Sequence, residues 1–234
     1  MKKKLYRLLP FIPKVNLFIG QTFYAFNIKL TRPSVIKKLV NVNGAYANIG
    51  CGDAGILAPY WINIDLGKYP TVTHTFDCRK ELPFADNTLK GIYTEHFFEH
   101  LDYTNEAQYF LQHCYRSLQK DGILRIIVPD AERYLIGYVK DGWDYLKQLR
   151  PLDDDLNDML MGIHYETKMQ LVNEVFRQGK EHKFAWDFET MKLCLEKAGF
   201  TKVYKMSYNT SNDTMMQIDQ KVRQPESLYV EAKK

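Results

Sequence analysis

The sequence of 234 residues has few cysteines, and no two of them are spaced as C-x-x-C. The four cysteines are Cys51, Cys78, Cys114 and Cys194. Zinc ribbons and thioredoxin-type redox sites need closely spaced cysteine pairs, and a disulfide framework needs a higher cysteine density. None of these three is expected here. We therefore expect free thiols, a reducing compartment and a cytoplasmic location.

A strong excess of charge of one sign is also missing. Lys and Arg number 32 and Asp and Glu number 28, which leaves a net charge of +4. A protein that binds nucleic acid concentrates basic residues on one face, so nucleic acid is not an expected partner. The apolar share of 45% and the charged share of 26% are those of a globular protein and exclude a disordered or collagenous chain.

No long apolar run opens the chain. Met1–Lys4 is basic, but Arg7 and Pro10 interrupt the apolar residues that follow. A signal peptide needs an unbroken apolar run, and a membrane span needs a longer and less charged one. We expect residues 1–44 to form an N-terminal arm or cap that packs on the domain, or that makes a weak contact with an anionic membrane surface.

From Tyr46 onward, apolar runs typical of strands alternate with helical patterns. Strands are predicted at residues 46–49, 61–65, 72–77, 91–94, 123–128, 202–208 and 227–232. One helix is predicted from Ala107 to Leu118, with Thr104 as its N-cap and Lys120-Asp121-Gly122 as its stop, and a second from Asp187 to Gly199. The fold class is α/β: a doubly wound, mostly parallel seven-stranded sheet with one antiparallel strand near the C-terminus.

The domain organisation predicted from this pattern is a domain over residues 45–234 with a cover inserted at about 131–183. The cover carries Tyr134, Tyr138, Trp143 and Tyr145. These rings are candidates for stacking on a sugar face or for packing in a core. Long insertions at the functional edge of an α/β sheet usually carry specificity, so we expect the cover to close over the acceptor.

A glycine loop follows the first strand. Gly50-Cys51-Gly52-Asp53-Ala54-Gly55 fits G-x-G-x-x-G, which serves dinucleotides and S-adenosylmethionine alike. Asp65 comes only 13 residues after Gly52, whereas the dinucleotide acid comes about 20 residues on, after a full helix whose N-terminus holds the pyrophosphate. S-adenosylmethionine has no phosphate and is favoured, with Asp65 accepting both ribose hydroxyls. An NAD-dependent oxidoreductase or epimerase is the alternative.

Several blocks in order resemble the class I S-adenosylmethionine-dependent methyltransferases. They are Ala47–Gly52, Trp61–Leu66, Asp77–Leu89, Tyr93–Leu101, Tyr115–Asp130 and Ala198–Phe200. Three stretches resemble more closely a bacterial subgroup linked with surface-polysaccharide synthesis: Trp61–Asp65, Glu95–Leu101 and Glu226–Ala232.

This resemblance implies a Rossmann-like methyltransferase fold, S-adenosyl-L-methionine as cofactor and methyl transfer to a small-molecule or glycan acceptor, at a hydroxyl. A catalytically silent relative that binds the cofactor is a further possibility. The cofactor-binding residues that the resemblance implies are Asn48, Gly50, Cys51, Gly52, Asp65, Leu66, Asp77, Cys78 and Glu95.

Candidate catalytic residues are His96, His100 and His182, because a histidine near the acceptor is a suitable general base near neutral pH. His96 follows the fourth strand, at the functional edge of the sheet. If a helix begins there, His96 and His100 lie on one face, as in a metal-binding helix, but no third ligand is obvious and no metal is expected. His100 is also a candidate structural histidine, and His182 is preferred to His164 in the cover.

Overall fold

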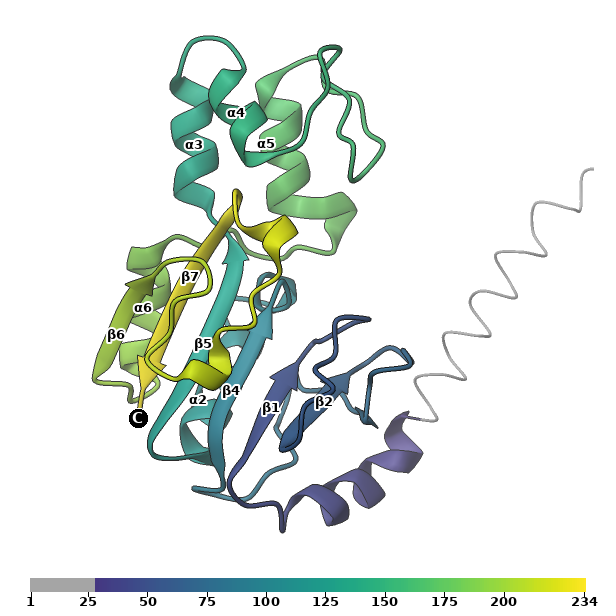
Figure 1. Cartoon of the computed structure of the whole chain (residues 1–234), viewed down its shortest axis with the longest axis vertical. Helices are drawn as coiled ribbons and strands as arrows, with labels where there is room; N and C mark the ends of the chain where they lie inside the picture. Colours follow the sequence, from purple (N-terminus) through teal and green to yellow (C-terminus); the bar gives the residue numbers. More distant parts are fainter. Residues whose placement is uncertain (1–27) are drawn as a thin grey trace, which may run out of the picture.

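The computed structural model describes residues 28–234, and its centre is a seven-stranded sheet in the order β3-β2-β1-β4-β5-β7-β6 (Figure 1). The strands are β1 Ala45–Ile49, β2 Trp61–Asp65, β3 His74–Thr75, β4 Leu89–Glu95, β5 Leu118–Pro129, β6 Lys202–Met206 and β7 Ser227–Lys233. Only β7 runs antiparallel to its neighbours, β5 and β6. The predicted fold class is therefore confirmed.

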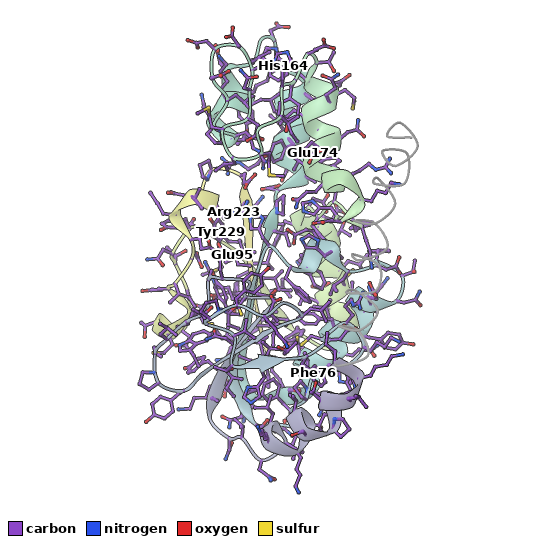
Figure 2. The ribbon with its side chains drawn as sticks, turned by 90° about the vertical axis from the view of Figure 1, so that its right-hand side faces the viewer. Phe76, Glu95, His164, Glu174, Arg223 and Tyr229 are labelled. Carbon is purple, nitrogen blue, oxygen red and sulfur yellow. The ribbon has the colours of Figure 1, made fainter. Side chains whose placement is uncertain are left out.

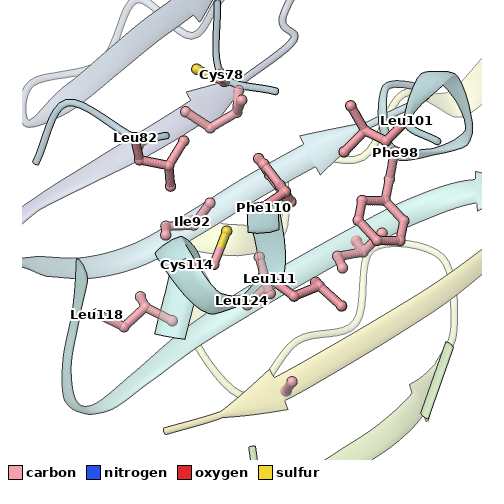
Figure 3. Packing of buried hydrophobic residues seen from close by; sticks show 14 of the residues in the cluster. Cys78, Leu82, Ile92, Phe98, Leu101, Phe110, Leu111, Cys114, Leu118 and Leu124 are labelled. Carbon is pink, nitrogen blue, oxygen red and sulfur yellow. The ribbon is translucent and has the colours of Figure 1, made fainter. Parts of the chain in front are cut away.

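One face of the sheet is mostly apolar, and α2 (Glu106–Ser117) and α6 (Phe188–Lys197) pack on it. The helix α2 buries Phe110, Leu111 and Cys114 against strand residues such as Ile92 and Leu124 (Figure 3). The second predicted helix starts where expected. Asp187 is its N-cap, and the Asp187 carboxylate accepts a hydrogen bond from the Thr190 N–H.

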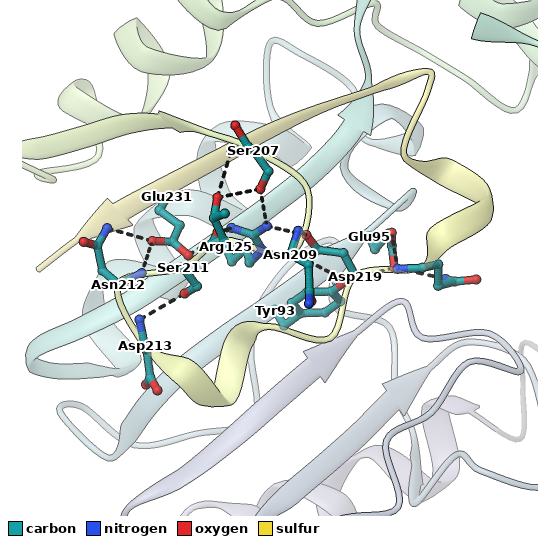
Figure 4. Close-up of polar contacts among 12 residues, drawn as sticks. Tyr93, Glu95, Arg125, Ser207, Asn209, Ser211, Asn212, Asp213, Asp219 and Glu231 are labelled. Carbon is teal, nitrogen blue, oxygen red and sulfur yellow. Dashed lines mark hydrogen bonds and ion pairs between the residues drawn. The ribbon is translucent and has the colours of Figure 1, made fainter. Parts of the chain in front are cut away.

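The other face is covered by the segment between β6 and β7, which includes the short 3-10 helices Thr214–Met216 and Lys221–Arg223. Aromatic strand residues meet this segment and bury Met216. Among them, Tyr46 stacks on Trp61 with ring centroids 5.2 Å apart. A buried polar network around Arg125 lies in the same layer (Figure 4).

A helical lobe stands beyond the end of β5 and consists of α3 (Ala131–Val139), α4 (Asp144–Leu149) and α5 (Lys168–Arg177) (Figure 1). The lobe has its own apolar core, in which Tyr134 is completely buried. Tyr134 therefore packs in a core and is not available for stacking on a sugar, whereas Tyr138 is 41% exposed. Below the lobe, the 3-10 helix Gln178–Lys180 leads the chain back to the sheet.

Three local expectations differ from the structure. The predicted strand 72–77 is ordered as a strand only at His74–Thr75, an edge position where β3 pairs with β2 alone. The N-cap of α2 is Asn105 rather than Thr104, because the Asp102 carboxylate accepts the Thr104 and Asn105 N–H groups and so fixes the turn.

The third difference is the end of α2, which falls at Ser117 and not at Lys120-Asp121-Gly122. The last carbonyls of this helix have partners elsewhere. The Asn87 and Thr88 N–H groups donate to the carbonyls of Arg116 and Ser117, and Lys234 Nζ donates to that of Leu118. With these partners, the helix needs no glycine cap and the chain passes directly into β5.

Residues 28–39 are helical, and Val35 and Leu39 in this helix pack into the core. The predicted membrane contact of the N-terminal arm falls chiefly on residues 1–27, outside the described residues. Within residues 28–234, no helix combines the length and apolar character needed to cross a bilayer.

Candidate functional site

A cleft of about 540 Å³ opens where the chain leaves β1, β2 and β4. Such carboxyl ends of parallel strands are where ligands bind in open α/β sheets. Seven of the residues predicted for the site line this cleft: Gly50, Asp65, Leu66, Asp77, Cys78, His96 and His100. The fold therefore brings residues from four separate sequence blocks to one cavity.

The loop after β1 requires glycine at its first position. Gly50 has a φ of +71°, and a Cβ there would lie 2.4 Å from the Phe97 ring. Gly52 also has a positive φ, of +53°, but a Cβ there would meet nothing within 4 Å. Gly50 is thus fixed by conformation and packing, whereas Gly52 is fixed by conformation and borders open space.

Two buried asparagines hold this loop in place. Asn63 on β2 receives the Ile56 N–H and donates to the Ile56 carbonyl, at 2.9 and 2.8 Å. Asn48 on β1 donates to Asn63 Oδ1 and to the Ala54 carbonyl, both at 3.4 Å. Asn48 is 3% exposed and does not line the cleft, so it supports the loop from below.

Asp65 closes the second side of the cleft. Its Oδ2 accepts the Gly52 N–H at 2.8 Å, and its Oδ1 accepts the Gly67 N–H at 2.6 Å. Each carboxylate oxygen has two lone pairs, so each retains one acceptor position. The same side chain therefore orders the glycine loop and has capacity left for two ligand hydroxyls.

Asp77 forms the far wall with Cys78 and Arg79. The guanidinium of Arg79 donates to both carboxylate oxygens of Asp77, at 2.8 and 2.7 Å. Burial acts to raise the pKa of Asp77, but the hydrogen bonds and charge of Arg79 outweigh it and lower the pKa. The Cys78 thiol is fully buried, which raises its pKa well above the usual value, so it is an uncharged surface.

His96 and His100 reach the cleft from the chain that follows β4. His96 is in a left-handed conformation with a φ of 52°, outside the 3-10 helix Phe98–His100. The expected helical relation of His96 to His100 is therefore wrong. His96 Nε2 lies 2.9 Å from Ser227 Oγ on β7, and burial, together with the charge of Arg223, lowers the pKa of His96 well below its usual value.

His182 does not line the cleft but lies directly behind His100. The two rings meet edge to face with centroids 4.8 Å apart. His100 Nδ1 lies 3.2 Å from the Glu181 carbonyl and His182 Nδ1 lies 2.6 Å from the Val175 carbonyl. Burial lowers the pKa of both rings, that of His182 to about 4.

Glu99 joins this group from the 3-10 helix and is 2% exposed. Its Oε1 lies 3.5 Å from His96 Nδ1 and 3.8 Å from His182 Nε2. Neither carboxylate oxygen has a hydrogen-bond partner among residues 28–234. Burial raises the pKa of Glu99 to about 8, so the group is mostly protonated at neutral pH.

The remaining predicted residues lie outside the lining of the cleft. Cys51 is buried under the loop, where desolvation raises its pKa to about 12. Glu95 faces the other side of the sheet, because alternate residues of a strand point to opposite faces. There its carboxylate accepts the Tyr93 hydroxyl at 2.8 Å and contacts Gln220. Figure 2 shows Glu95 with Tyr229, away from Phe76 in the cleft lining.

Four residues that the sequence patterns do not assign to the site also line the cleft: Tyr69, Arg79, Phe97 and Lys183. Arg79 was detectable in principle, since an Arg two residues after Asp77 can pair with it. Tyr69 and Lys183 carry no such local signal, because only the fold brings them to the cleft.

Residues 47–126 match the family model described as a methyltransferase domain. This segment contains most of β1, all of β2 to β4 and most of β5, and with them the seven predicted residues of the cleft. This match indicates a methyltransferase. The NAD alternative loses its physical basis, because residues 50–60 between β1 and β2 form turns and supply no helix N-terminus for a pyrophosphate.

The chain is also similar to solved structures of low identity. One is an S-adenosylmethionine-dependent methyltransferase from Mesorhizobium loti, at 13% identity and a TM-score of 0.48, over 87% of this chain and 97% of that chain. Another is a possible histamine N-methyltransferase from Thermotoga maritima, at 16% identity and a TM-score of 0.47, over 97% and 99%.

A third similar structure is phosphoethanolamine N-methyltransferase 2 from Haemonchus contortus in complex with S-adenosyl-L-methionine. Its identity is 11% and its TM-score 0.45, over 86% of this chain and 51% of that chain. No curated protein matches the chain.

Proposed function

We propose that the 540 Å³ cleft binds S-adenosylmethionine and that the enzyme methylates a hydroxyl of a small-molecule or glycan acceptor. The observation that carries the proposal is that one cavity joins the Gly50 loop, Asp65 and the Asp77-Cys78 pair. Asp65 would accept the two ribose hydroxyls. The loop would face the methionine part, and Asp77 and Cys78 would meet the adenine.

A polar acceptor is favoured by the side chains at the histidine end of the cleft. His96, His100, Lys180, Glu181 and Lys183 offer hydrogen-bond donors and acceptors of both charges. Hydroxyl-rich molecules suit such a surface better than flat apolar ones do. This chemistry, with the subgroup resemblance, leads us to propose a sugar-containing acceptor of the kind used in surface-polysaccharide synthesis.

Methyl transfer depends mainly on how the protein positions the acceptor oxygen against the methyl group of the cofactor. The methyl group sits on a sulfonium and moves by in-line displacement, so holding the acceptor oxygen close and aligned removes much of the barrier. The acceptor hydroxyl loses its proton during the transfer, and a neutral histidine would take it. His96 at the cleft wall is the first candidate; His100 also lines the cleft, and His182 lies behind His100.

Cofactor binding is tested by calorimetric titration of the wild type and Asp65→Ala with S-adenosylmethionine. Charge-assisted hydrogen bonds contribute roughly 1.5–3 kcal/mol each, so Asp65→Ala should bind at least about tenfold more weakly. Asp53→Ala is the matched control, since Asp53 is an exposed acid of the same loop. Equal affinities for wild type and Asp65→Ala would remove Asp65 from the site, and titration with NAD should show no binding.

Turnover is tested with a panel of hydroxylated sugars and radiolabelled cofactor. If a histidine is the base, His96→Ala or His182→Ala should lower kcat by about 10²-fold or more while leaving cofactor affinity within about threefold. A loss of less than about threefold in both would mean that positioning alone drives transfer. A wild type that binds the cofactor and methylates nothing on the panel would favour a silent relative.

A further inference from the structure

Three groups that could ligate a metal converge beside the cleft. Glu99 and His100 come from the 3-10 helix after β4, and His182 comes from the segment that returns from the helical lobe. One ligand atom from each lies within 4.8 Å of the other two. Because His182 is 82 residues from His100 in the chain, this convergence is a product of the fold.

The hydrogen bonds of both rings leave the same nitrogen free. His100 Nδ1 and His182 Nδ1 each face a backbone carbonyl, at 3.2 and 2.6 Å. A carbonyl only accepts, so each Nδ1 carries the proton and each neutral ring keeps a lone pair on Nε2. A second-sphere carbonyl on the other nitrogen is the arrangement that fixes histidines that bind metals.

Glu99 supplies the observation that points to a ligand. Its side chain is 2% exposed, its Oε1 lies 3.8 Å from His182 Nε2, and neither oxygen has a hydrogen-bond partner among the described residues. Buried polar groups of native proteins almost always have partners, because an unsatisfied carboxyl in the interior is costly. A cation between this carboxylate and the two imidazoles would satisfy all three groups together.

We propose that Glu99, His100 and His182 bind one divalent transition-metal ion of the zinc class. Two imidazoles with one carboxylate form a recognised set for zinc and for ferrous iron, and such sites keep open positions for water or substrate. Ligands bound at about 2.0–2.2 Å stand roughly 3.3 Å apart, so the three groups must close by about 1.5 Å from their present spacing.

The ion has an entry path and few competitors. His100 and Glu181 line the 540 Å³ cleft, so the set is reached from the cavity proposed for the cofactor and acceptor. Residues 1–27 contain no His, Cys, Asp or Glu and cannot supply a rival side-chain ligand. All four cysteines are buried free thiols. A bound ion could orient an acceptor hydroxyl in the cleft, and this role rests on the proposed function. The binding of the ion to the three side chains does not depend on that function.

The experiment is a calorimetric titration of the full chain with ZnCl₂ after treatment with a chelator and dialysis. The wild type should bind one equivalent of Zn²⁺, and Co²⁺ at the same site should give a visible absorption band. His100→Gln and His182→Gln should each weaken Zn²⁺ binding by about 100-fold or more, since losing even an outer-sphere partner of a ligand costs 10–100-fold. His164→Gln is the matched control, because His164 lies at the distal part of the helical lobe (Figure 2).

Two results would overturn the proposal. One is a wild type that takes up no Zn²⁺ at micromolar concentrations. The other is unchanged affinity in His100→Gln, which is half-buried and expected to fold. If His182→Gln fails to fold, the His100→Gln titration decides alone. Titration with S-adenosylmethionine is run in parallel, so that a missing metal site and a missing cofactor site are told apart.

Discussion

Two buried polar clusters, one around Arg125 and one around Glu99, differ in how completely their groups are hydrogen-bonded. The Arg125 guanidinium and the carboxylates beside it are hydrogen-bonded, whereas neither oxygen of Glu99 has a hydrogen-bond partner among the described residues. The contacts of Glu99 with His96 and His182 are longer, at 3.5 and 3.8 Å. Both clusters are equally withdrawn from water, with Arg125 0% and Glu99 2% exposed. The comparison therefore isolates the effect of pairing from the effect of burial.

Arg125 uses all five of its N–H donors. Its Nε and one terminal nitrogen donate to Asp219, and the other terminal nitrogen donates to Glu231 at 3.0 Å and to the Thr210 carbonyl at 2.9 Å. The fifth donor reaches the Ser207 carbonyl at 3.4 Å (Figure 4). The network fastens the segment between β6 and β7 to the sheet, which is a structural role.

A second paired cluster ties the helical lobe to the sheet. Arg150 on the lobe donates to Asp158 and to Glu226, which precedes β7, both at 2.7 Å. Glu226 also accepts the Tyr134 hydroxyl at 2.9 Å and a bond from Arg223. Elsewhere the chain thus gives its buried carboxyl groups hydrogen-bond partners, and at Glu99 it does not. This contrast is why we read the Glu99 group as a binding site.

The largest expected effect is that of Arg125→Met. Removing the guanidinium leaves Asp219 and Glu231 buried without their cation, and breaking a buried pair in this way typically costs about 3–5 kcal/mol. The free energy of unfolding from urea denaturation, followed by circular dichroism, measures the loss. Lys205→Met is the control, because the Lys205–Glu132 pair is exposed and exposed pairs contribute about 0–1 kcal/mol. A loss of under 1 kcal/mol in Arg125→Met would show that the network is not structural.

A smaller effect is expected for Tyr134→Phe in the lobe. The substitution removes one buried hydrogen bond to Glu226, which keeps its bonds to Arg150 and Arg223. We expect a loss of about 1 kcal/mol in the free energy of unfolding, the usual net contribution of one such bond. Tyr138→Phe on the exposed side of the lobe should change it by less than about 0.5 kcal/mol. Equal effects of the two substitutions would contradict this interpretation.

Much of the fold could be predicted from the sequence because its signals are local. The run Trp61–Asp65 is a strand with the predicted bounds, and Asp187 caps α6 as its position before an apolar helical face indicates. The cleft residues Gly50, Asp65 and Asp77 were also accessible, since strand ends in a parallel sheet gather at one edge.

The rest could not be predicted, because it depends on contacts between distant residues. Arg125 stands out as the charge in an apolar strand, but its partners Asp219 and Glu231 follow 94 and 106 residues later. The sequence suggests that His96 and His100 share one face of a helix. The backbone at His96 is left-handed, so the two residues do not share a helix, and the His100 ring instead contacts that of His182. Glu95 was assigned to the cofactor, but strand alternation turns it to the Tyr93 side.

The smallest effect on stability is expected for Glu99→Gln, and this prediction sharpens the comparison most. Burial raises the pKa of Glu99 to about 8, so at pH 7 the substitution replaces one mostly neutral group with another of the same shape. No hydrogen bond among the described residues is lost. In chelator-treated protein, the free energy of unfolding should therefore change by less than about 1 kcal/mol, against about 3–5 kcal/mol for Arg125→Met.

Urea denaturation of the two variants side by side, at one pH and in the same buffer, makes the comparison direct. If Glu99→Gln lowered the free energy of unfolding as much as Arg125→Met, the Glu99 carboxyl would have to be as firmly paired as the groups around Arg125. The interpretation of Glu99 as a group available to a ligand would then be wrong. If Glu99→Gln is neutral in chelated protein but abolishes the stabilisation that added Zn²⁺ gives the wild type, the carboxyl serves the ion and not the fold, since a ligand stabilises only the state that binds it.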